Sequence, residues 1–89
     1  MIDLRARFRE NTHPRLAEMR GALEAASSDT NALATLARHF HALSGMGGTY
    51  GFPRVSELGD EGELLLRKPD PAALARCGEL VDEIERELC

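Results

Sequence analysis

Apolar residues recur three or four positions apart through most of the chain. Between positions 30 and 50 they are Leu33, Leu36, Ala37, Phe40 and Leu43. This spacing places their side chains on one face of a helix, so we predict a helix over about 30–50. The same period recurs over about 53–67 and from 71 to the end of the chain. These patterns predict three amphipathic helices that share one core.

The first part of the chain has the same period with an interruption. Apolar side chains recur over 2–26, but Asn11-Thr12-His13-Pro14 breaks the pattern. Thr12 is a residue type that caps helices, and Pro14 would then lie in the first helical turn, where a missing N–H costs little. We therefore predict a short helical arm over 2–10, a kink or break, and a helix that ends near Ala26.

Turn signals separate these segments. Ser28 or Asp29 can cap the second predicted helix, and Gly51 can end it in a left-handed conformation. The run Lys68-Pro69-Asp70-Pro71 is typical of the end of one helix, and Asp70 can cap the helix that follows. Because short connections make consecutive helices antiparallel, we predict an all-α fold, an up-down four-helix bundle with a short N-terminal helical arm, in one domain over 1–89.

Composition narrows the range of partners. The net charge is −4 and most acids follow residue 55, which argues against nucleic acid or an anionic membrane as partner. Two cysteines, Cys77 and Cys89, are too few for a disulfide framework and fit a reducing cytoplasm. No apolar run is suited to a signal peptide or a membrane span. We expect a cytoplasmic monomer.

His41 is the leading candidate for chemistry. It follows Phe40 and is therefore rotated about 100° from the apolar stripe, toward solvent. Ser44, Gly45 and Gly48 lie one and two turns further along the same side, so few side chains surround the imidazole. Glycine in a helix costs about 1 kcal/mol relative to alanine, which suggests that something must approach this surface closely.

The run His41-Ala42-Leu43-Ser44-Gly45, followed by Gly48, Gly51-Phe52, Val55, Leu58 and Glu63, resembles the histidine-containing phosphotransfer (HPt) domain. The resemblance covers essentially the whole chain. It implies a phosphocarrier without an ATP site of its own, with His41 as phospho-acceptor. It implies response-regulator receiver domains and a (hybrid) histidine kinase as partners. The sequence has no phosphate loop and no carboxylate cluster for a metal, so we expect this chain to bind no cofactor and Mg²⁺ to be held by the receiver.

Several roles near His41 stay open at this level. Ser44 stands where the family often has Lys; it either donates to a phosphoryl oxygen or is small for clearance. Arg38 either supplies positive charge or is a solvated residue. Gly45 and Gly48 either admit a partner or permit helix packing. His39 points about 200° away from His41, so we predict no metal site.

Two functions remain in competition. The first is a phosphorelay intermediate that accepts a phosphoryl group on His41 and passes it to a receiver aspartate. The alternative is a helical docking module that binds a receiver or kinase without being phosphorylated. An enzyme with its own active site is disfavoured because the polar residues do not converge on a pocket.

Overall fold

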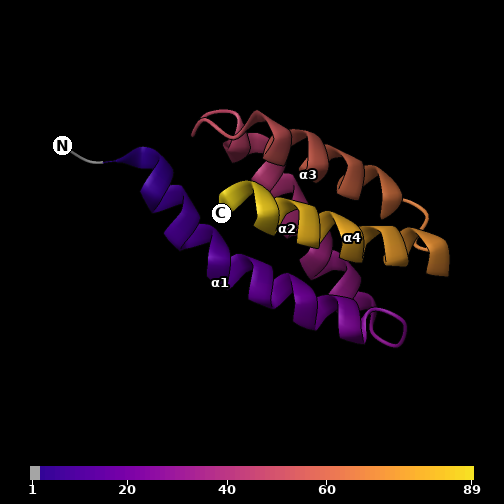
Figure 1. Ribbon diagram of the computed structural model, residues 1–89. Helices are drawn as coiled ribbons and strands as arrows, with labels where there is room; N and C mark the ends of the chain where they lie inside the picture. Colours follow the sequence, from indigo (N-terminus) through magenta and orange to yellow (C-terminus); the bar gives the residue numbers. More distant parts are fainter. Residues whose placement is uncertain (1–2) are drawn as a thin grey trace.

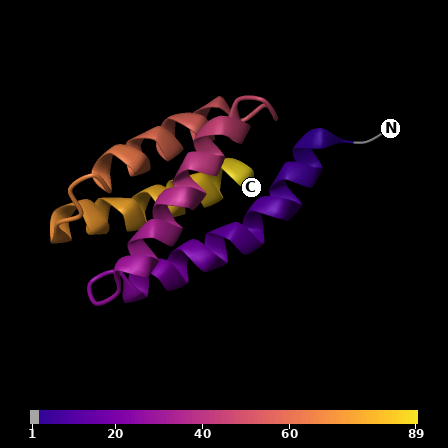
Figure 2. The same cartoon turned by 180° about the vertical axis from the view of Figure 1, so that it is seen from behind.

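The computed structural model describes residues 3–89 and shows four helices. They are α1 (Leu4–Ala25), α2 (Thr30–Gly47), α3 (Pro53–Leu65) and α4 (Pro71–Leu88). Consecutive helices run antiparallel, and α4 returns alongside α1 to close the bundle (Figures 1 and 2). The predicted all-α, up-down four-helix bundle is confirmed. None of the helices in the described part of the chain is long and apolar enough to cross a membrane.

The helix starts follow the predicted capping residues. The Asp29 carboxylate accepts a hydrogen bond from the Asn31 N–H at 2.8 Å, and Asp70 accepts one from the Ala73 N–H at 2.8 Å. Pro53 and Pro71 are the first residues of α3 and α4, where no intrahelical N–H bond is lost. Local sequence therefore fixes where these helices begin.

Gly51 ends the second helix as predicted. Its φ is +88°, in the left-handed region that glycine adopts without steric cost. The Gly51 N–H donates to the Gly48 carbonyl at 3.2 Å and the Phe52 N–H donates to the Gly47 carbonyl at 2.7 Å. These two bonds form a Schellman motif, which reverses the chain toward α3. Regular α2 structure ends at Gly47, slightly earlier than the predicted position 50.

Of the predicted kink or break at residues 11–14, the break is wrong, because α1 is one helix from Leu4 to Ala25 with Pro14 inside it. Thr12 does not cap a helix; it is buried on the inner stripe of α1 together with Phe8 and Leu16. That stripe continues across the proline without a change of register. Pro14 and Glu10, whose carbonyl loses its helical partner, are both exposed, so water can hydrate the free carbonyl. Residues 4–10 of the predicted arm are thus the first part of α1, which extends past the other helices (Figure 1), and residue 2 lies outside the described residues.

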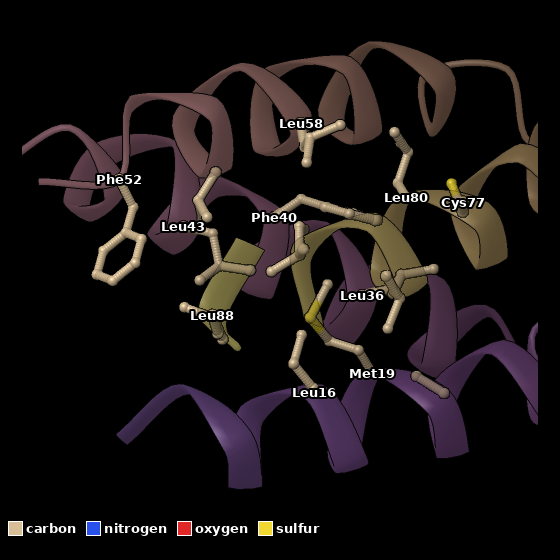
Figure 3. Packing of buried hydrophobic residues seen from close by; sticks show 14 of the residues in the cluster. Leu16, Met19, Leu36, Phe40, Leu43, Phe52, Leu58, Cys77, Leu80 and Leu88 are labelled. Atoms are coloured by element: carbon tan, nitrogen blue, oxygen red, sulfur yellow. The ribbon is translucent and has the colours of Figure 1, made fainter. Parts of the chain in front are cut away.

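The core is formed by apolar side chains from all four helices (Figure 3). Its fully buried members include Met19, Leu36, Phe40, Leu43, Val55, Leu58, Cys77, Leu80, Val81 and Ile84. Cys77 is one of these core residues, and burial raises the pKa of its thiol to about 11. Leu64, in contrast, is an exposed apolar side chain of α3.

Helices α2 and α3 form the closest contact in the bundle. A Cβ atom at Gly59 would lie 2.7 Å from the Ser44 backbone nitrogen and 2.8 Å from the Phe40 carbonyl oxygen. A Cβ atom at Gly62 would lie 2.5 Å from the Phe40 ring. Only glycine fits at these positions, and the two backbones approach because of it. Glycine at positions 59 and 62 is therefore what allows α2 and α3 to approach closely.

His39 connects α2 to α1. Arg15 Nη1 donates to His39 Nδ1 at 2.8 Å, and His39 Nε2 lies 2.9 Å from the Glu18 carboxylate. Both contacts are satisfied when the imidazole is neutral and carries its proton on Nε2. Burial lowers the pKa of His39, and the positive charge of Arg15 lowers it further, while Glu18 opposes this shift.

We expect Gly59→Ala to destabilise the protein, because the new methyl group meets backbone atoms that cannot move aside. Overpacking of this kind typically costs about 1–3 kcal/mol. Gly21→Ala in α1 is the matched control, because a Cβ there meets nothing within 4 Å and helix propensity favours alanine. Thermal unfolding of both variants checks this. A Gly59→Ala protein as stable as the Gly21→Ala protein would show that α2 and α3 are not in close contact.

We expect acid to destabilise the contact between α1 and α2. Because the pKa of His39 is lowered in the folded state, the unfolded chain binds more protons as the pH falls below 6.5, and stability is lost over that range. The charged groups around the ring are Arg15 and Glu18 from α1 and Arg38 from α2. His39→Gln cannot titrate and should flatten the stability profile below pH 6.5.

Denaturant unfolding between about pH 5 and 7 measures this effect. His13→Gln is the control, since His13 is an exposed histidine of α1. If His13→Gln flattened the profile as much as His39→Gln did, the pH dependence would not come from the contact between the helices.

Candidate functional site

The His41 side chain projects from the solvent side of α2 and is 80% exposed. Its Nδ1 atom lies 3.0 Å from Oε2 of Glu63 on α3. The Glu63 side chain is 34% exposed, so the neighbouring helix partly shields it. One ring nitrogen of His41 is therefore engaged by a carboxylate, and the other edge of the ring faces solvent. The prediction that the imidazole lies at the edge of the core face is confirmed.

This contact selects one form of the neutral ring. A carboxylate accepts hydrogen bonds and does not donate them, so the proton of the neutral imidazole lies on Nδ1. The lone pair is then on Nε2, which can attack an electrophile. A carboxylate behind a histidine also fixes the ring orientation. The arrangement can support nucleophilic chemistry at Nε2.

The contacts around His41 follow a simple antiparallel register. Three pairs connect α2 or its turn to α3, and the two members of each pair lie the same number of residues before and after Phe52. The pairs are His41 with Glu63, Ser44 with Asp60, and Gly48 with Ser56. The Gly51 turn sets this register, and Gly59 and Gly62 bring the helices close enough for the contacts to form.

Ser44, one turn beyond His41, is already engaged within the protein. Its hydroxyl donates to the carboxylate of Asp60. To donate to a phosphoryl oxygen, Ser44 must first release Asp60. The predicted assisting role of Ser44 therefore stays a prediction and requires a rearrangement of this pair.

Arg38, one turn before His41, is exposed and donates to the Thr35 hydroxyl at 3.3 Å. Within residues 3–89 its guanidinium forms no ion pair with a carboxylate. It is a positive charge on the same helix as His41 and is not neutralised by a neighbour. Its predicted role toward a phosphate is compatible with this geometry.

Gly45 and Gly48 leave the surface beside His41 open. A Cβ atom at Gly45 would meet nothing within 4 Å, and one at Gly48 would make only an ordinary contact, 3.5 Å from Ser56 Oγ. Both glycines are exposed. Neither is needed for packing within this chain, in contrast to Gly47, where a Cβ would lie 2.7 Å from the Ser56 nitrogen. The alternative that Gly45 and Gly48 permit helix packing is not supported.

The acids of α3 are divided into two groups by their partners. Glu57 pairs with Arg54 at 3.8 Å, and Glu61 pairs with Arg76 at 2.7 Å, which lowers the pKa of Glu61. Asp60 and Glu63, which contact Ser44 and His41, have no arginine or lysine partner within residues 3–89. The surface next to His41 therefore holds two carboxylates that are not neutralised.

Asp60 was missed as a site residue by the sequence analysis, and Glu63 was named only as part of the family motif. Neither stands out in a helix that contains many acids. The signal that identifies them is positional: they are the α3 residues that mirror Ser44 and His41 across the turn at Phe52. They can be identified only once the register of α2 and α3 is known.

The two histidines of the His39-x-His41 motif lie on different sides of α2, as their spacing predicts. His39 contacts α1 and His41 contacts α3. Within residues 3–89 no three side chains of His, Cys, Asp or Glu are grouped as metal ligands. The two imidazoles do not combine into one site.

Comparison with known proteins identifies the family. The chain matches the model of the Hpt domain over residues 3–88, essentially its whole length. Comparison with curated proteins and with solved structures gave no match. Hpt domains are phosphocarriers that take part in histidine phosphotransfer and interact with receiver domains and kinases of two-component systems. The exposed, carboxylate-bound histidine on a four-helix bundle agrees with this match, and the chain belongs to the Hpt domain family.

Proposed function

We propose that His41 is the phospho-acceptor of a phosphorelay intermediate, which takes a phosphoryl group from one receiver aspartate and passes it to another. The observation that carries this proposal is the state of the His41 ring. Its Nδ1 is bound by Glu63 while its exposed edge lies beside Gly45, where no side chain intervenes. A nucleophilic nitrogen on an open surface is what transfer between two proteins requires.

In the transfer step, Nε2 of His41 attacks the phosphorus of the donor's aspartyl phosphate. The N–P bond forms as the P–O bond to the aspartate breaks, and the aspartate leaves as a carboxylate with the bonding electrons. The ring gains positive charge while its Nδ1 proton stays on the hydrogen bond to Glu63, whose negative charge stabilises it. In the reverse step an acceptor carboxylate attacks the phosphorus and neutral His41 is restored.

Positive charge for the phosphoryl group has few sources in this chain. The negative charges of Asp60 and Glu63 repel a phosphate. Arg38 is the cation nearest to His41 along α2. We therefore assign most of the charge neutralisation to the receiver, including the Mg²⁺ ion expected there. This chain contributes the nucleophile, its orientation and an open docking surface at Gly45 and Gly48, and it needs no ATP site.

The proposed relay operates between receiver domains and a hybrid histidine kinase, with this domain as a monomer in the cytoplasm. Both cysteines are free thiols, which fits a reducing compartment. The direction of phosphate flow depends on the partners.

One observation favours the alternative of a docking module that is not phosphorylated. Where the family often has Lys, Ser44 is bound to Asp60, and within residues 3–89 no arginine or lysine pairs with the carboxylates of Asp60 and Glu63. The two functions differ in a single measurable product, because only the relay forms an acid-labile, alkali-stable phosphoryl label on the protein.

We expect His41→Gln to abolish acceptance of phosphate from a phosphorylated receiver while the fold is retained. His41 is exposed, and substitutions at such positions usually change stability by less than about 0.5 kcal/mol. His39→Gln is the control, because His39 lies between α1 and α2 and should leave labelling nearly intact. Labelling of the His41→Gln protein would exclude His41 as the acceptor.

We expect Glu63→Ala to slow phosphate acceptance roughly tenfold or more, since the ring loses the carboxylate that orients it and stabilises its positive charge. Glu63→Gln keeps a hydrogen-bond acceptor but not the charge, so its rate should lie between those of the alanine variant and the native protein. Glu57→Ala, on the same helix and paired with Arg54, is the control. Equal rates for the Glu63→Ala and Glu57→Ala proteins would leave Glu63 without a role in transfer.

We expect Gly48→Gln to preserve or raise thermal stability and to slow transfer. The backbone at Gly48 is right-handed helical and a Cβ fits there, so the side chain costs nothing in packing. It would, however, hold a receiver away from His41, and a misplacement of about 1 Å can reduce the rate a hundredfold. Gly21→Gln on α1 is the control. A folded Gly48→Gln protein with the native transfer rate would show that receivers do not dock on this surface.

A further inference from the structure

A hollow lies away from His41, between the first half of α1 and the end of α2. Its volume is about 370 Å³, within the range of pockets that hold small molecules. The lining residues are Leu4, Arg7, Phe8, Asn11, Thr12, Arg15, Met46 and Tyr50. None of them takes part in the phosphotransfer site, because α2 presents Met46 to α1 and His41 to the opposite side.

The charge in this hollow is positive and not neutralised. Arg20, Arg54 and Arg76, elsewhere in the bundle, each pair with at least one carboxylate. Within residues 3–89, neither Arg7 nor Arg15 forms such a pair. Arg15 donates one N–H to His39, and its guanidinium has further donors. Arg7 and Arg15 both line this hollow, and guanidinium groups favour a carboxylate or a phosphate.

The floor of the hollow is apolar. Phe8 is buried and stacks on Tyr50, with ring centroids 5.4 Å apart, and Met46 packs against the core. Asn11 and Thr12 also line the hollow. A pocket with an apolar floor and two cations at its wall matches a ligand with an apolar body and an anionic head.

We infer that this hollow, which we call the α1–α2 pocket, binds a small amphipathic organic anion, with Arg7 and Arg15 on its carboxylate or phosphate and Phe8, Met46 and Tyr50 around its apolar part. The size of the pocket favours a free small molecule over a partner helix, which would require a long groove. Binding would join α1 to the end of α2. This inference does not depend on phosphorylation of His41.

The chain supplies its own reporter for this pocket. Tyr50 is the only tyrosine and there is no tryptophan, so intrinsic fluorescence reports on one pocket residue. Octanoate, used below the concentration at which it aggregates, is the probe. Octanol tests the need for charge, octyl phosphate tests the other headgroup, and inorganic phosphate tests the need for the apolar body.

We expect saturable quenching or enhancement of Tyr50 fluorescence by octanoate or octyl phosphate, and none at matched concentrations of octanol or inorganic phosphate. Arg7→Gln should weaken binding roughly tenfold or more, as for loss of a hydrogen bond to a charged group. Arg67→Gln, at the opposite end of the bundle, and His41→Gln should bind as the native protein does. In methyl NMR spectra, the Met46 signal should shift while that of Met19 in the core should not.

Three results would overturn the inference. Equal binding of octanol and octanoate would show that the arginines do not select an anion. Equal weakening by Arg7→Gln and Arg67→Gln would show an effect of total charge. Binding only to vesicles that contain anionic lipid, with no response to octanoate or octyl phosphate, would show that Arg7 and Arg15 contact a membrane surface and not a small molecule. If His41 were never phosphorylated but octanoate bound as expected, the proposed function would fail and this inference would stand.

Discussion

The close approach of α2 and α3 is the constraint on which the site depends. Gly59 and Gly62 allow the α3 backbone to lie against Ser44 and Phe40, at distances that no Cβ atom would permit. At ordinary helix separations the short carboxylate of Asp60 would not reach Ser44, and Glu63 would not hold the His41 ring. Gly59 and Gly62 thus act indirectly, because the close helix approach that they allow determines that Asp60 and Glu63 lie beside Ser44 and His41.

The ionic contacts of α3 follow from the same packing. On its side toward α4, Glu61 is neutralised by Arg76, which also contacts Glu79 and Glu83. On its side toward α2, Asp60 and Glu63 have a hydroxyl and an imidazole as partners instead. A phosphoryl group on His41 would add negative charge to a surface that is already negative. This negative charge favours transfer of the phosphoryl group to a partner. It also gives a partner with basic side chains an electrostatic advantage.

Much of the fold could be predicted from the sequence because local chemistry determines it. Asp29, Asp70 and Pro71 begin helices, and Gly51 ends one, by interactions that extend over only a few residues. The continuity of α1 through Pro14 could not be predicted in this way. The local signal for a break is real, but burial of Phe8, Leu16 and Met19 on one stripe outweighs the cost of the proline. Tertiary packing decided between two local conformations.

The candidate site was predictable only in part. His41 could be found because its motif is contiguous in sequence, and its exposure follows from its angle to the stripe. Glu63 and Asp60 belong to a second helix, and their proximity depends on a register set jointly by the Gly51 turn and the glycines of α3. The pairing of Ser44 with Asp60 likewise follows from that register and is not visible from Ser44 alone.

The central claim is that α3 holds Glu63 on Nδ1 of His41 and so leaves Nε2 as the nucleophile. The most direct measurement is the position of the phosphoryl group on the ring. Protein labelled with ¹⁵N-histidine can be phosphorylated by a receiver or by phosphoramidate, and ¹⁵N–³¹P coupling then identifies the bonded nitrogen. We predict phosphorus on Nε2 of His41, with the Nδ1 proton retained. Phosphorus on Nδ1 would contradict the account, because that nitrogen would then be the free one.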